Sequence, residues 1–133
     1  MLKTTGIIII VAFATVGTGW IWGASGRADI DRTRRAAELR ADFAEARALL
    51  LEARVSLFKV NFGDAGRSLD AARTRVAALQ TRLRESGQAE RAGRLEIALA
   101  HVGDAGRLTL ALDGRAHAAA EGALAALTAA AIP

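Results

Sequence analysis

The sequence predicts an all-α protein, with a single N-terminal transmembrane helix followed by a small antiparallel helical bundle of about four helices, paired as two helix-turn-helix hairpins. One observation is the segment Thr4–Gly26, which carries no charge. Another is the apolar spacing of three and four residues that starts at Ala36. The third is a composition rich in Ala, Leu and Arg, with one proline at the C-terminus. We expect an anchor over residues 1–26 and an extramembrane bundle over 27–133.

The uncharged segment is long enough to cross a lipid bilayer. As a helix it would be about 35 Å long, against a hydrocarbon core of about 30 Å. Trp20 and Trp22 lie near its C-terminal end, where indole rings favour the headgroup boundary. A cleaved signal peptide fits less well, because Gly23–Ser25 is a poor small-residue cleavage site. A buried core helix would need a larger domain to cover it.

One side of the predicted anchor carries small residues at every fourth position, Thr15, Gly19 and Gly23. Such spacing lets a second membrane helix approach closely, so we expect helix packing here. The alternative is that glycine is simply common in membrane helices, and the sequence leaves both open.

Positive residues near the anchor predict its orientation. Only Lys3 precedes the span, whereas Arg27, Arg32, Arg34, Arg35 and Arg40 follow it. The positive-inside rule favours a cytoplasmic bundle over a periplasmic one, in a membrane such as the bacterial inner membrane, although large domains can translocate regardless of charge. We expect Arg32, Arg34 and Arg35 to lie at the membrane interface, where each contact with anionic headgroups contributes about 1 kcal/mol.

The first soluble helix carries a heptad seam, with Asp29 or Asp31 as its expected N-terminal cap. Leu49, Leu51, Val55 and Phe58 widen its apolar stripe, which predicts burial on more than one side and favours a bundle. Pairing of the seam with a second copy of the chain is the alternative. The seam residues are Ala36, Leu39, Phe43, Ala46, Leu50, Ala53, Leu57 and Val60.

The pentapeptide Gly-Asp-Ala-Gly-Arg occurs twice, at 63–67 and 103–107, which indicates a duplicated helix-turn-helix unit. We expect each glycine to end a helix and each aspartate to cap the next one. The second, third and fourth helices would then carry Leu69–Leu83, Ala92–Val102 and Leu108–Leu127. An anion site at the two helix starts, aided by arginine, is the alternative. The predicted caps are Gly63, Asp64, Gly103 and Asp104.

Over residues 46–127 this arrangement resembles tetratricopeptide-like helical hairpins, in which Gly-Asp commonly joins the two helices of a repeat. The repeat here spans forty residues (63 to 103) where that family has thirty-four, and the aromatic signature is missing. The resemblance implies stacked antiparallel hairpins that offer a protein-binding face.

The sequence argues against catalysis, metal and cofactor binding. Cysteine is absent, and the two histidines, His101 and His117, are expected roughly 15 Å apart along neighbouring helices, too far to share a metal. No P-loop or dinucleotide fingerprint occurs. Acidic and basic residues are interspersed despite a net charge of +4, which argues against nucleic acid.

These observations favour a non-catalytic, membrane-anchored accessory or structural subunit that stabilises or assembles a larger membrane protein complex, for example a respiratory or photosynthetic one. Its expected partners are other subunits and the lipid bilayer, and a homo-oligomer is possible. The alternative is a membrane-tethered adaptor or sensor that recruits a soluble protein through its hairpins.

Overall fold

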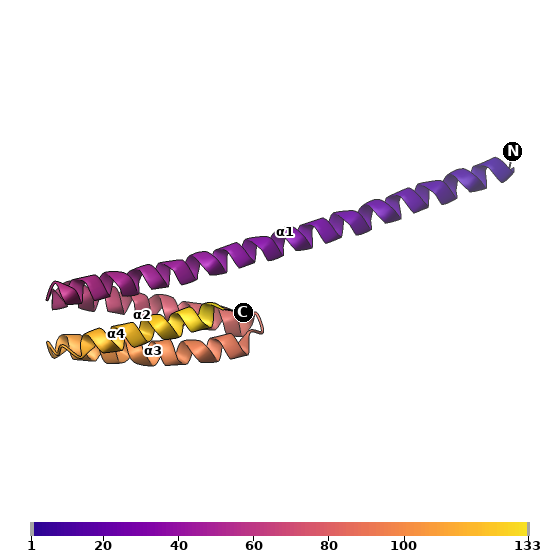
Figure 1. Ribbon diagram of the computed structural model, residues 1–133. Coiled ribbons are helices and arrows are strands. Elements are labelled where there is room, and N and C mark those ends of the chain that lie inside the picture. The colour runs from indigo at the N-terminus through magenta and orange to yellow at the C-terminus, as the bar shows by residue number, and fades with distance from the viewer. Residues whose placement is uncertain (1, 133) are drawn as a thin grey trace. The chain divides into compact units, whose positions relative to one another are not determined.

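The computed structural model describes the backbone of residues 2–132 and the side chains of residues 29–132. Over these residues the protein is all-helical, with no strand (Figure 1). The prediction of an all-α fold is therefore confirmed. Backbone contacts divide the chain into two compact units, Met1–Glu38 and Leu39–Pro133. The helices are α1 (Leu2–Phe58), α2 (Phe62–Glu85), α3 (Ala89–Leu110) and α4 (Ala116–Ala131).

The predicted membrane anchor lies outside the described side chains. None of the helical stretches whose side chains are described is long and apolar enough to span a bilayer. The division into an anchor over 1–26 and a bundle over 27–133 stays a prediction. So do the roles of the five residues singled out there, Thr15, Gly19, Trp20, Trp22 and Gly23.

The start of the first soluble helix is corrected by the structure. Asp29 and Asp31 lie inside α1, so neither caps a helix. Instead Asp29 lies 3.5 Å from the Arg32 guanidinium, and its carbonyl accepts a hydrogen bond of 2.9 Å from the Thr33 hydroxyl. Both contacts join residues three or four apart, as expected within a continuous helix.

Residues 39–58 of α1 pack with α2, α3 and α4 around one apolar core. The predicted seam of α1 is buried from Phe43 to Leu57 and so packs within the chain, whereas Ala36 and Val60 at its ends are exposed. All five predicted seam residues of α2 are buried as well. The α1 and α2 core residues are Phe43, Ala46, Leu50, Ala53, Leu57, Leu69, Ala72, Val76, Leu79 and Leu83. The many alanines let the helices approach closely.

The expectation that α1 buries more than one side is wrong for the single chain. Leu49 is partly buried, but Leu51, Val55 and Phe58 are 41%, 51% and 70% exposed. The outer face of α1 is therefore largely uncovered by the described residues, with the Phe58 ring in contact with His117 of α4.

All three interhelical turns close with the same pair of backbone hydrogen bonds. After α1, Val60 N–H donates to the Leu57 carbonyl at 2.9 Å, and Asn61 N–H donates to the Ser56 carbonyl at 2.8 Å. The turns after α2 and α3 repeat this pattern. It is the Schellman motif, which satisfies carbonyls at a helix C-terminus and requires one residue in the left-handed conformation. Those residues are Gly87 (φ 76°), Val60 (φ 58°) and Leu112 (φ 53°).

None of the four predicted cap residues caps a helix. Asn61 is the N-cap of α2, and its side-chain oxygen accepts a hydrogen bond of 3.2 Å from Asp64 N–H. Gly63 lies in the first turn of α2. Gly103 and Asp104 lie inside α3, between the buried residues Val102 and Ala105. A break there would expose both neighbours, and tertiary burial outweighs the weak helix propensity of one glycine. The duplicated pentapeptide therefore occupies two different structural positions.

Alanine substitution distinguishes a helix-interior glycine from a helix-ending one. We expect Gly103→Ala to raise the free energy of unfolding by about 0.5–1 kcal/mol, because nothing lies within 4 Å of the added Cβ and alanine favours the helix. The matched change Gly87→Ala should lower it by about 1–2 kcal/mol, because alanine is strained at positive φ. Urea unfolding measures both. A loss of stability in Gly103→Ala would contradict its place inside α3.

Candidate protein-interaction surface

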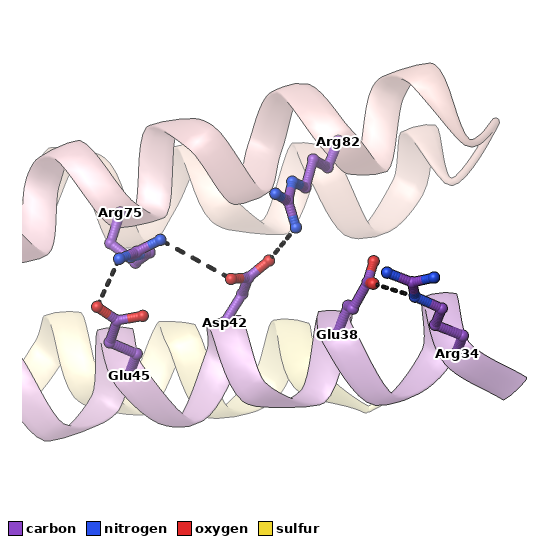
Figure 2. Close-up of polar contacts among 6 residues, drawn as sticks. All are labelled: Arg34, Glu38, Asp42, Glu45, Arg75 and Arg82. Atoms are coloured by element: carbon purple, nitrogen blue, oxygen red, sulfur yellow. Dashed lines mark hydrogen bonds and ion pairs between the residues drawn. The ribbon is translucent and has the colours of Figure 1, made fainter.

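A network of ion pairs joins α1 to α2 (Figure 2). Asp42 lies between two guanidinium groups, 2.5 Å from Arg82 and 3.8 Å from Arg75, and Arg75 also contacts Glu45 at 2.5 Å. The Asp42 side chain is only 16% exposed, so its pairs are better shielded from water than ordinary surface pairs. Because each of these carboxylates contacts an arginine of α2, the network holds α1 against α2.

The three arginines predicted at the membrane interface all lie on exposed parts of α1. Arg32 contacts Asp29, and Arg34 contacts Glu38 at 3.0 Å (Figure 2). No ion pair of Arg35 occurs among the described residues. Their contact with lipid headgroups stays a prediction.

The alternative of an anion site is not supported by the geometry. Each arginine of the repeated pentapeptide contacts the aspartate three residues before it, Arg67 with Asp64 and Arg107 with Asp104. Arg67 and Asp64 line an open hollow of about 240 Å³ between α1 and α2. The Asp64 carboxylate already binds the Arg67 guanidinium, so an incoming anion would have to displace that carboxylate.

The two histidines belong to separate packing contacts. The His101 ring lies against Gly122, where an added Cβ would stand 3.0 Å from Nδ1. The ring of His117 packs against Phe58, with centroids 4.7 Å apart. Among the described residues, no group of three or more potential ligands could hold a metal ion. These histidines therefore act as contacts between α3 and α4 and between α1 and α4.

One end of the bundle exposes large apolar side chains. The α1–α2 and α3–α4 turns both lie at this end, and the α2–α3 turn lies at the other (Figure 1). Four side chains on or beside the two turns are 68–85% exposed, namely Phe58, Val60, Leu110 and Leu112. We call these four residues the apolar end. Clustered exposed apolar residues mark interaction surfaces more often than isolated ones do.

Two residues of the apolar end have strained backbones. Val60 and Leu112 have positive φ, which costs L-residues with a Cβ roughly 1–2 kcal/mol each. At the opposite end the equivalent position is Gly87, which adopts that conformation without strain. Since neither side chain is buried, core packing does not explain why glycine is absent. Strain of this kind is common at functional surfaces.

A repeated four-residue pattern in the sequence marks this surface. Phe58-Lys59-Val60-Asn61 and Leu110-Ala111-Leu112-Asp113 share an apolar residue, a spacer, a second apolar residue and an amide or acid. Asn61 caps α2, and Asp113 accepts hydrogen bonds from Arg115, which hold the pKa of this aspartate below its usual value. This second repeat marks the true helix ends. It was missed because glycine, the usual turn residue, is absent from it.

Comparison of the chain with protein families, curated proteins and solved structures finds no match. The candidate interaction surface is therefore described by its geometry, as an apolar end of the helical bundle.

Proposed function

We propose that this protein is a non-catalytic, membrane-anchored accessory subunit that stabilises or assembles a larger membrane protein complex. The apolar end is its contact with a neighbouring subunit, and residues 1–26 are its anchor. A membrane-tethered adaptor that recruits a soluble protein through the same end is the second candidate.

The observation that carries the proposal is the exposed, strained pair Val60 and Leu112. The bundle already buries its core seams, so these side chains contribute little to folding. Their backbone strain is a cost that a partner's apolar surface would offset on binding, because burying a leucine or valine contributes about 1.5–3 kcal/mol. The pairing of Asp42 and Glu45 with arginine favours a structural role for these carboxylates over a catalytic one.

The double variant Val60→Gly/Leu112→Gly separates binding from folding. Glycine suits both left-handed positions, so we expect the free energy of unfolding of the variant to exceed that of the parent by about 1 kcal/mol or more. It removes two apolar side chains from the surface, so we expect it to lose its partner. The measurement is a mild-detergent purification of the intact chain from its own cells, with copurifying proteins identified and counted.

A matched control is Ile97→Ala, which removes an exposed apolar side chain of α3 outside the apolar end and should keep the partner. A fixed ratio of membrane subunits that survives detergent and salt would support the accessory-subunit proposal. A soluble protein that dissociates with salt would support the adaptor instead. Purification of the chain without any partner would overturn both.

A further inference from the structure

The outer face of α1 carries a second heptad seam, distinct from the buried one. Its residues alternate in steps of three and four, and every one of them is exposed. The three largest, Leu51, Val55 and Phe58, are 41–70% exposed, although large side chains are normally buried at such positions. We call this the outer seam: Ala41, Ala44, Ala48, Leu51, Val55 and Phe58.

Opposite charges flank the outer seam on its two sides. Arginine precedes the residues Ala41, Ala48 and Val55, at positions 40, 47 and 54. Glutamate follows Ala44 and Leu51, at positions 45 and 52, and Lys59 follows Phe58. In heptad notation these are the g and e positions, whose charges decide partner and direction in coiled coils. Arg40, Arg47 and Glu52 form no ion pair within the described part of the chain.

We propose that the outer seam pairs with the same seam of a second copy of this chain, in parallel and in register. In a parallel pair each g residue faces the e residue five positions further along the other helix. Arg40 then faces Glu45 of the second copy, and Arg47 faces Glu52 of the second copy. The third pair, Arg54 with Lys59 of the second copy, carries like charges and lies at the C-terminal end of the seam. Glu45 also contacts Arg75 of its own chain, but its side chain remains 51% exposed and accessible to a second cation.

The charges favour this direction over the opposite one. In an antiparallel pair g faces g and e faces e, which would place arginine against arginine along the whole g row, whereas a parallel pair places two of its three arginines against glutamate. A bilayer surface fits less well than a second copy, because the glutamate row would face anionic headgroups. The parallel direction follows from the charges at positions 40–52, which lie outside the apolar end, and does not depend on the proposed anchor.

The absence of cysteine from the sequence makes the test direct. Single substitutions Ala41→Cys and Ala48→Cys are made in the full chain, and disulfide formation is induced with a mild oxidant. Both residues are at a positions of the outer seam. In a parallel, in-register pair each lies opposite the same residue of the second copy, within the distance that a disulfide spans. We expect both variants to form disulfide-linked dimers. Ala78→Cys, on an exposed face of α2, is the control and should remain monomeric.

The two cysteine positions also distinguish the direction of pairing. They lie one heptad apart, so an antiparallel pair can bring at most one of them opposite itself. Crosslinking of only one position, or of neither above the Ala78→Cys background, would overturn the proposal. A result of this kind would leave the accessory-subunit function intact, since that function is read from copurifying subunits.

Charge exchange provides an independent check. We expect Arg47→Glu and Glu52→Arg each to raise the dimer dissociation constant by about three- to tenfold, because each places like charges opposite one another across the seam. The double variant restores opposite charges and should return the constant to near the parent value. Circular dichroism of each variant controls for folding. A double variant weaker than both singles would contradict the pairing of g with e.

Discussion

Replacing Leu50 by alanine is expected to lower the free energy of unfolding by about 2–5 kcal/mol. Leu50 is fully buried, and the core residues one turn away on α1, Ala46 and Ala53, are fully buried as well. Alanines this close have no side-chain atoms that could move into the space left by a leucine. The cavity term therefore adds to the lost transfer free energy.

The adjacent leucine is a matched control for this prediction. Leu51→Ala removes the same atoms from a side chain that is 41% exposed, so we expect a loss of less than about 1 kcal/mol. Both variants are compared by urea unfolding at concentrations where the protein is monomeric. Equal losses for the two would contradict the assignment of Leu50 to the inner face of α1.

Replacing Arg91 by alanine is expected to lower the free energy of unfolding by about 2–3 kcal/mol, because the Arg91 guanidinium binds the C-terminal end of α4. Its Nε donates to the Ala130 carbonyl at 3.1 Å, and its Nη2 donates to the Ala131 carbonyl at 3.0 Å. A positive charge at a helix C-terminus also favours the helix dipole. The guanidinium lies 5.4 Å from the centre of the Phe43 ring, which adds a cation–π contact with α1. Burial, and then Arg94, lower the pKa of Arg91 from its usual value.

The effect of Arg91→Ala should be concentrated in α4. Relative to the parent, we expect amide hydrogen exchange to accelerate more in the last turn of α4 than in α2. We also expect the urea midpoint of unfolding to fall. Arg84→Ala is the control, because the Arg84–Glu96 pair of 2.7 Å joins two exposed side chains and should contribute less than about 1 kcal/mol. Uniformly faster exchange across all helices would argue against a local role for Arg91.

The buried seams were predictable from sequence, whereas the helix ends were not. Residues such as Leu50 and Val76 repeat at helical spacing, and burial of one helix face is what that spacing encodes. Gly103 misled the prediction because its poor helix propensity is a local property, while the burial of Val102 and Ala105 depends on α2 and α4. The turn that exposes the apolar end requires a positive φ at Val60. Sequence propensities do not predict that conformation for a β-branched residue.

The outer seam illustrates a different limit of sequence analysis. Leu51 and Phe58 were expected to widen one buried stripe, because both lie within the broad apolar surface of a single helix. In the structure α2, α3 and α4 cover the inner side of residues 39–58, whereas Leu51 and Val55 on the outer side stay exposed. Periodicity reveals which residues share a face, but the number and placement of neighbours decide which face is covered.

The left-handed conformation of Val60 and Leu112 has a consequence for how such a protein evolves. Glycine at either site would relieve strain, and stabilising substitutions of this kind are easily found when only folding is selected. Selection for thermal stability alone would therefore drift toward glycine at both turns and erase the surface proposed to contact a partner. Retention of large apolar residues at these two sites, in any laboratory or natural lineage, would report selection for binding.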